Sequence, residues 1–264
     1  MGGLFDFKGD KVVVTGASNE RGIGFASARM FAEQGARLLL TGTTKQVEVR
    51  AAQLRDLGCE AHAWLGDLTA EAASRELAVA AREFLGGVDV LVNNAGMTSI
   101  ALPSADSGES ATAGEITFDA WQLGISRNLN TAFLATRALL PMLRESTRPR
   151  VVMVTSVTGP LMAMRHEAAY AAAKAGMVGL TRSLALDEAG HGVCVNAVAP
   201  GWIATASQTD SEASQGKATP LGRSADPREV AAAIVFLGSR EASYISGQLL
   251  VVDGANSIAE ERSL

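Results

Sequence analysis

The sequence predicts an α/β fold in which a doubly wound, parallel seven-stranded sheet lies between two layers of helices, a three-layer αβα sandwich. Two observations support this prediction. Short runs rich in Val and Leu alternate with longer alanine-rich segments whose apolar residues recur at helical spacing. Several of the short runs are apolar at nearly every position, as expected for strands that helices cover on both faces.

The predicted elements follow one another from Lys11 onward. The strands are Lys11 to Val14, Arg37 to Leu40, Glu60 to Leu65, Val88 to Val92, Arg150 to Thr155, Val193 to Val198 and Leu249 to Val252. The helices are Gly24 to Gln34, Ala70 to Phe84, Phe118 to Arg144, Ala168 to Ala189 and Pro227 to Gly238. Two polar stretches, Ser99 to Gly114 and Gly201 to Thr219, are predicted as surface loops. Because ligands of such sheets bind outside the carboxyl ends of the strands, we expect these loops to border a substrate site.

Composition narrows the class of protein. The 264 residues suit one domain covering 1–264, with 47% hydrophobic and 19% charged residues. A net charge of −5 with scattered Lys and Arg argues against nucleic acid as a partner. Apolar stretches are far shorter than the roughly 20 residues of a membrane span, and no signal-like segment opens the sequence, so a cytoplasmic protein without a membrane partner is expected. Cys59 and Cys194 are isolated, which predicts no metal site.

A glycine-rich turn directly follows the first predicted strand. It covers Thr15 to Gly24, reads TGASNERGIG and opens a helix. Glycines permit a tight turn and close backbone approach to a pyrophosphate, and the helix amino terminus offers unpaired N–H groups. Strand, turn and helix together predict a Rossmann-like dinucleotide site. Its turn residues would be Gly16, Ser18, Arg21, Gly22, Ile23 and Gly24.

The end of the second predicted strand favours NADP (NADPH) over NAD. An acidic residue there would bind the ribose hydroxyls of NAD, but none occurs between Glu33 and Glu48. Thr43 and Lys45 offer a hydroxyl and a cation instead, and Arg21 adds a second cation, which together would accept a 2′-phosphate. The alternative for both cations is an ordinary solvated surface charge.

Three residues form a candidate catalytic group. Ser156 follows the fifth predicted strand, and Tyr170 and Lys174 lie one turn apart on the next helix. Tyrosine has a pKa near 10, and a neighbouring ammonium group would lower it. A serine hydroxyl could then hold a substrate oxygen while the phenol transfers a proton. By spacing alone the signal is weak, because a Tyr and a Lys four residues apart are usually just part of a helix surface.

Further motifs extend this pattern along the chain. They are Asp67-Leu68 after the third strand, Asn93-Asn94-Ala95-Gly96 after the fourth, Asn128, Tyr170-Ala-Ala-Ala-Lys174, Pro200-Gly201 and Val252-Asp253-Gly254. In this order and spacing, from Lys11 to about Asn256, the chain resembles the short-chain dehydrogenase/reductase family. The resemblance implies that Tyr170 is the acid/base, that Lys174 lowers its pKa and holds the nicotinamide ribose, that Ser156 orients the carbonyl and that Asn128 anchors a relay water.

The resemblance also implies the remaining cofactor contacts. Asp67 and Leu68 would line the adenine, and Asn94, Ala95 and Gly96 would support the cofactor. Pro200, Gly201, Ile203 and Thr205 would pass along the nicotinamide. The structural alternatives are a helix cap at Asp67, turn formers at Asn93 and Asn94 and a plain loop at Pro200.

The sequence departs from the family pattern in three places. Five residues, rather than three, separate the first two glycines of the turn, the stretch from Ser99 to Ile116 is longer than usual, and the interval from Ser156 to Tyr170 has about one extra residue. Enoyl reductases of the superfamily also have longer turns, but their Tyr and Lys are further apart than Tyr170 and Lys174. Carbonyl reduction is therefore the favoured chemistry.

The closest pattern is that of 3-oxoacyl-[acyl-carrier-protein] reductases, which the segments Pro220-Leu-Gly-Arg223 and Ser246-Gly247-Gln248 resemble. It implies NADPH-dependent reduction of a 3-oxoacyl thioester or similar ketone, and a homotetramer. A secondary-alcohol dehydrogenase for a sugar, polyol or steroid is the alternative, and a catalytically silent nucleotide-binding protein the third. Leu186-Asp187-Glu188 would repel an acidic carrier unless Arg127, Arg165 and Arg182 face the entrance. His166 either lines the pocket or lies on the surface.

Overall fold

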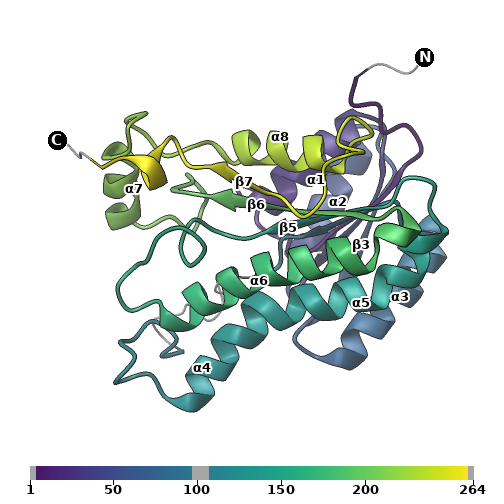
Figure 1. The fold of residues 1–264 in the computed structure, drawn as a ribbon. Coiled ribbons are helices and arrows are strands. Elements are labelled where there is room, and N and C mark those ends of the chain that lie inside the picture. Colours follow the sequence, from purple (N-terminus) through teal and green to yellow (C-terminus); the bar gives the residue numbers. More distant parts are fainter. Residues whose placement is uncertain (1–3, 97–106, 261–264) are drawn as a thin grey trace.

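The predicted sheet is confirmed. A computed structural model describes residues 4–96 and 107–260 and contains seven parallel strands in the order β3-β2-β1-β4-β5-β6-β7 (Figure 1). The strands are β1 (Lys11–Val14), β2 (Arg37–Gly42), β3 (Ala61–Leu65), β4 (Val90–Asn93), β5 (Arg150–Val154), β6 (Cys194–Pro200) and β7 (Leu249–Val252). The order reverses direction between β1 and β4, which is the position where doubly wound sheets bind their ligands.

Helices cover both faces of this sheet (Figure 1). One layer holds α1 (Ile23–Glu33), α2 (Gln46–Asp56) and α8 (Pro227–Gly238), and the other holds α3 (Glu71–Leu85), α5 (Thr131–Glu145) and α6 (Ala168–Asp187). Each layer has its own core. Phe31 and Ile234 belong to the first, whereas Leu77, Leu139 and Met177 belong to the second, and all five are fully buried.

The start of α8 shows how local sequence fixes an element. Asp226 accepts a hydrogen bond from the N–H of Arg228, while the Glu229 side chain accepts one from the N–H of Asp226. Pro227 lies in the first turn, where its missing N–H costs nothing. This capping box explains why the predicted bounds of the helix agree with the observed ones.

The long helix predicted over Phe118 to Arg144 is wrong as a single element. The chain instead forms α4 (Phe118–Ile125), a π-helical segment over Ser126–Asn130, and α5. Two side chains bond to carbonyls four residues earlier: Asn128 Nδ2 donates to Gly124 at 3.1 Å, and Thr131 Oγ1 to Arg127 at 2.9 Å. Such bonds compete with the regular backbone ladder and account for the wider turn.

Two helices were not predicted. The segment Gly201 to Thr219, expected to be a loop, contains α7 (Asp210–Lys217), which a capping box between Thr209 and Glu212 initiates. Helix α2 presents a buried stripe formed by Val47, Arg50, Ala51 and Leu54. Its spacing is helical, but an arginine occupies one of the positions where an apolar residue is expected. Polar residues therefore concealed both helices.

The carboxyl ends of the strands lie at one edge of the sheet. Helix α7 and the beginning of α6 lie at the same end of the molecule (Figure 1). Of the predicted loop Ser99 to Gly114, residues 99–106 lie outside the described residues, and 107–114 form turns and a short bridge. Within 4–96 and 107–260, none of the helices has the length and hydropathy needed to span a bilayer.

Candidate active site and cofactor cradle

The glycine-rich turn is tied to the end of β4 by side chains. Asn94 Nδ2 donates to the carbonyls of Thr15 at 3.1 Å and Gly16 at 2.9 Å. In return, Thr15 Oγ1 accepts the backbone N–H groups of Asn94 at 3.0 Å and Ala95 at 2.9 Å. Two chain segments almost 80 residues apart are thus fixed against each other at the position where the strand order reverses.

Glycine is required at two positions of this turn. Gly16 has a φ of +69°, and a Cβ there would lie 2.8 Å from the Cα of Ala95. Gly24 lies in the first turn of α1, and a Cβ there would lie 2.5 Å from Asn94 Nδ2 and 2.6 Å from the carbonyl oxygen of Gly16. Close packing of turn, helix and β4 therefore excludes any side chain at either position.

The turn fits a dinucleotide phosphate group. Gly22 precedes α1, no side chain caps that helix, and its first turn carries no acidic residue. Ser18 Oγ is buried without a hydrogen-bond partner among the described residues, and it packs so closely on Gly42 that a Cβ there would overlap it. Free helix N–H groups and an unpaired hydroxyl are suited to a pyrophosphate, and Ile23 and Gly24 supply part of that first turn.

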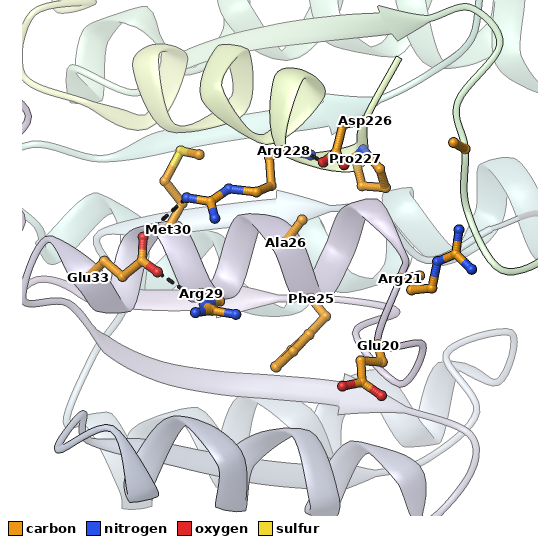
Figure 2. Close-up of a pocket in the computed structure, with 11 residues that line it drawn as sticks. Glu20, Arg21, Phe25, Ala26, Arg29, Met30, Glu33, Asp226, Pro227 and Arg228 are labelled. Carbon is orange, nitrogen blue, oxygen red and sulfur yellow. Dashed lines mark hydrogen bonds and ion pairs between the residues drawn. The ribbon is translucent and has the colours of Figure 1, made fainter. Parts of the chain in front are cut away.

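One of the extra residues of the turn is anchored to α2. Glu20 forms an ion pair with Arg50 of α2 at 2.9 Å, which holds the pKa of the Glu20 carboxyl below its usual range. Arg21 is exposed, and its side chain points away from that of Glu20 (Figure 2). Thr43 and Lys45 are likewise exposed, immediately beyond β2. Arg21 and Lys45 form no ion pair with another described residue, so both cations remain available to an anion.

The four predicted catalytic side chains come together at the carboxyl ends of β4 and β5. Ser156 follows β5, Tyr170 and Lys174 lie on the first turns of α6, and Asn128 lies in the π-helical segment. Tyr170 is hydrogen-bonded to the Ser156 side chain. Asn128 and Lys174 both lie next to Gly96, where an added Cβ would be 3.0 Å from Asn128 Oδ1 and 3.3 Å from Lys174 Nζ.

Burial shifts the pKa values of two of these groups. It raises the pKa of Tyr170 to about 12, against the opposing effect of the Ser156 hydrogen bond. It also lowers the pKa of Lys174 to about 8. Lys174 Nζ lies 5.6 Å from the centre of the Tyr170 ring and donates to the carbonyl of Val154 at 3.0 Å. The pKa of Tyr170 is therefore raised, and Lys174 is not among the groups that lower it; the lowering by Lys174 that the sequence implies stays a prediction.

Known proteins resemble this chain over nearly its whole length. The family model described as enoyl-(acyl carrier protein) reductase matches residues 16–255. The chain belongs to the short-chain dehydrogenase/reductase family. Members of this family bind a nicotinamide cofactor and act on small molecules, which agrees with the cradle and the side-chain group described above.

Individual relatives of this family differ in their described activities. The oxidoreductase UcpA of Salmonella typhimurium is 35% identical over 97% of both chains. The 3-oxoacyl-[acyl-carrier-protein] reductase FabG of Vibrio cholerae is 38% identical, over 94% of this chain and 98% of its own. A structure described as an NAD(P)-dependent gluconate 5-dehydrogenase from Beutenbergia cavernae, with bound NADP at low occupancy, is 36% identical, covers 97% of this chain and all of its own, and has a TM-score of 0.86.

The remaining cofactor positions that family membership suggests follow β3 and β6. Leu68 is buried, while Asp67 is exposed and accepts hydrogen bonds from the N–H and the hydroxyl of Thr69. These bonds close a local turn before α3, and that helix has no side-chain cap. Pro200 ends β6, and its neighbours continue the same edge of the sheet: Gly201 packs against Asp253, Ile203 is buried and Thr205 is half-buried.

A separate hollow of about 260 Å³ lies along α1 beside the beginning of α8 (Figure 2). Arg21 and Ala204 lie on its wall together with Phe25, Met30 and Pro227. None of the four predicted catalytic side chains lines it. The hollow therefore borders the phosphate turn and does not include the position where Ser156 and Tyr170 meet.

Charges near the entrance differ from those that the sequence suggested. Glu188 is buried and pairs with Arg144, and Leu186 lies 16 residues beyond Tyr170 on α6, about 24 Å away at 1.5 Å per residue. The acidity at the end of α6 therefore does not act at the entrance. Arg182 is similarly distant on the same helix, and His166 is exposed on the surface.

Sequence reasoning missed three polar groups close to the site. Thr15 organises the turn, Arg50 anchors it, and Glu109 forms an ion pair with Arg127 next to Asn128. Thr15 was visible as the first residue of the glycine-rich motif. Glu109 lies in a stretch of Ser, Asp, Glu and Gly whose pattern gives no sign of burial. Only the folded chain shows that its carboxylate faces inward.

Proposed function

We propose that this protein is an NADPH-dependent carbonyl reductase with Tyr170 as its acid. The observation that carries the proposal is the convergence of the four side chains Asn128, Ser156, Tyr170 and Lys174 beside a cradle that fits a dinucleotide. When bound, the nicotinamide supplies the hydride that reduces the carbonyl carbon. All remaining tasks belong to side chains of this chain.

Each of the four side chains has a physical task in this mechanism. The hydroxyls of Ser156 and Tyr170 are hydrogen-bonded to each other and can both contact one substrate oxygen. Tyr170 gives its proton to that oxygen as negative charge develops there. Lys174 holds the cofactor ribose and offsets the charge on the phenolate, and Asn128 fixes the path by which Tyr170 regains a proton.

NADPH is the proposed cofactor, with NAD as the alternative. Thr43, Lys45 and Arg21 are exposed around the end of β2 and the phosphate turn, and none of them is a carboxylate that would repel a 2′-phosphate. The NADP bound to the Beutenbergia relative, at 36% identity, supports the same choice.

The proposed substrate is a 3-oxoacyl thioester or a similar ketone, which is reduced to the 3-hydroxy product. Support comes from the 38% identity to the Vibrio reductase and from the segments 220–223 and 246–248. Arg127 cannot guide an acidic carrier protein to the site, because it is largely buried in its ion pair with Glu109. Arg165 is exposed near the start of α6 and is the cation that remains for that role.

A second candidate is a dehydrogenase for a sugar or polyol. Its support is the acidic surroundings of Tyr170, where Glu167 and Glu212 both act to raise the pKa of the phenol. Carboxylates at an active-site entrance disfavour anionic acyl carriers and accept hydrogen bonds from substrate hydroxyls. The identity of 36% to the gluconate 5-dehydrogenase structure points in the same direction.

Assembly as a homotetramer is proposed through α5, α6 and β7. The described residues leave Phe133, Leu186 and Leu250 of these elements exposed by 43%, 81% and 38%. Such apolar side chains are suited to burial against further copies of the chain. Light scattering of the purified protein measures the mass directly, and a monomer in dilute solution would refute the assembly.

Parallel titration with NADPH and NADH, followed by addition of a 3-oxoacyl thioester, tests cofactor and substrate together. We expect tighter binding of NADPH and loss of its absorbance when thioester is added. Oxidation of sugars or polyols with NADP, and no thioester turnover, would instead favour the second candidate. Tyr170→Phe removes only the hydroxyl and should lower kcat by about 10²-fold or more at unchanged cofactor affinity. Retained turnover in this variant would refute the mechanism.

A further inference from the structure

A segment preceding α4 contacts both elements that carry the proposed catalytic residues. Residues 107–115 follow the fourth strand and belong to the stretch that is longer than usual for the family. Ala111 pairs with Glu167 in a short parallel bridge at the beginning of α6. The Ser110 hydroxyl also donates to the Glu167 carboxylate at 2.7 Å. Tyr170 lies three residues further along the same helix.

The same segment reaches the Asn128 turn through a buried ion pair. Only 6% of Glu109 is exposed, and its Oε1 accepts hydrogen bonds from Arg127 Nη1 and Ser107 Oγ, each at 2.5 Å. The Arg127 side chain is itself only 16% exposed. Both charged groups are largely shielded from water. Removing either partner would leave an unpaired buried charge, which is costly.

Arg127 is connected to the geometry of Asn128. The two residues are neighbours in the π-helical segment, where the Asn128 side chain donates to the carbonyl of Gly124. Glu109 also approaches Gly124, since a Cβ on that glycine would lie 3.5 Å from Glu109 Oε2. The Glu109 carboxylate therefore binds the guanidinium of Arg127, which belongs to the π-helical segment. It also faces Gly124, whose carbonyl accepts the hydrogen bond of the Asn128 amide.

We propose that Glu109 and Arg127 are positioning residues, through which segment 107–115 fixes the turn that carries Asn128 relative to the beginning of α6. The proposal rests on the proposed function, in which Asn128 serves proton return to Tyr170. Small displacements of such groups slow catalysis strongly. Cofactor affinity depends on other residues and is expected to stay unchanged. A structural role alone would change stability and leave turnover per folded molecule intact.

Steady-state kinetics of Glu109→Gln separates these two roles. We expect kcat to fall about ten- to hundredfold, with the KM for NADPH unchanged. Arg127→Lys, which keeps the positive charge, should lower kcat less than Arg127→Met does. The matched control is Glu188→Gln, because Glu188 is also buried and paired with an arginine, Arg144, at the far end of α6. That variant should lose stability and keep its kcat. A kcat for Glu109→Gln equal to that of this control would overturn the proposal.

A double variant shows whether Glu109 acts through Asn128. Asn128→Ala alone should lower kcat, and Glu109→Gln added to it should lower kcat little further, since the group that it positions is already gone. If the two losses multiply, Glu109 acts by another route and the proposal is wrong.

Hydrogen exchange gives a readout that needs no substrate. Backbone amides over 124–131 and at the beginning of α6 should exchange faster in Glu109→Gln than in wild type or Glu188→Gln. Unchanged exchange over 124–131 refutes positioning whatever the substrate is. If Glu109→Gln exchanges faster but the wild-type protein turns over no carbonyl or alcohol, the positioning of the turn is upheld and the proposed function is refuted instead.

Discussion

Replacing Gly16 by alanine should damage both stability and cofactor binding, and the structure gives the size of the effect. Gly16 has a φ of +69°, and an added Cβ would lie 2.8 Å from the Cα of Ala95. The left-handed conformation costs alanine roughly 1–2 kcal/mol. Forcing a methyl group against a packed backbone adds about 1–3 kcal/mol. The free energy of unfolding should therefore fall by about 2–5 kcal/mol.

Gly58→Ala is the matched control. Gly58 has a φ of +83°, and no described atom lies within 4 Å of the position of its Cβ. Only the conformational cost of roughly 1–2 kcal/mol applies there. Urea unfolding followed by circular dichroism measures both variants, and the difference between them isolates the contact with Ala95.

Cofactor titration completes the test of Gly16. Because Ala95 and Asn94 hold the turn, their displacement should weaken NADPH binding at least about tenfold, equivalent to 1.4 kcal/mol. Gly58→Ala should bind NADPH as wild type does. Equal stability losses in the two variants, together with equal NADPH affinities, would refute the close-packing argument.

Three further predictions concern specificity, pH and packing. Thr43→Asp places a carboxylate beyond β2 and should lower kcat/KM for NADPH at least about tenfold by charge repulsion, while kcat/KM for NADH is kept or raised; equal losses for both cofactors would count against the 2′-phosphate site. Burial lowers the pKa of Lys174 to about 8 from 10.5, so above pH 8 the unfolded chain binds more protons than the native one, and this group makes stability rise with pH up to 10.5. Tyr170, with its pKa raised to about 12, acts in the opposite direction only above pH 10, so melting temperatures between pH 8 and 10 should show a rise that Lys174→Met removes. Leu139→Ala empties a fully buried position beneath the sheet and should cost about 2–5 kcal/mol of unfolding free energy at unchanged cofactor affinity, measured by urea unfolding and NADPH titration.

Buried strands and capped helices were predictable because their signals are local. β1 and β7 begin and end at the predicted residues, and so does α8, whose Asp226-Pro227 start is visible in the sequence. The turn from Thr15 to Gly24 was predictable for the same reason. Its glycines serve a backbone geometry that no other residue type can adopt.

Features that depend on distant partners were not predictable. The π-helical segment replaces regular helix because of what the Asn128 side chain contacts, and no hydrophobic period records that. Arg50 is buried because Glu20 and the ring of Phe25 meet it, although an arginine normally predicts a solvated position. Glu109 likewise has an inward-facing carboxylate only because Arg127 lies opposite it. Charge pairing thus decided the burial of residues that hydropathy assigns to the surface.

The hydrogen bonds of Asn94 make nucleotide binding a late event in the synthesis of the chain. The turn at Thr15 and Gly16 leaves the ribosome early, yet the side chain that holds its carbonyls is made 78–79 residues afterwards. Until β4 has been added beside β1, a nascent chain carries the complete phosphate-turn sequence without the cradle. Stalled nascent chains of increasing length should therefore capture no NADPH until Asn94 has emerged and β4 has paired with β1.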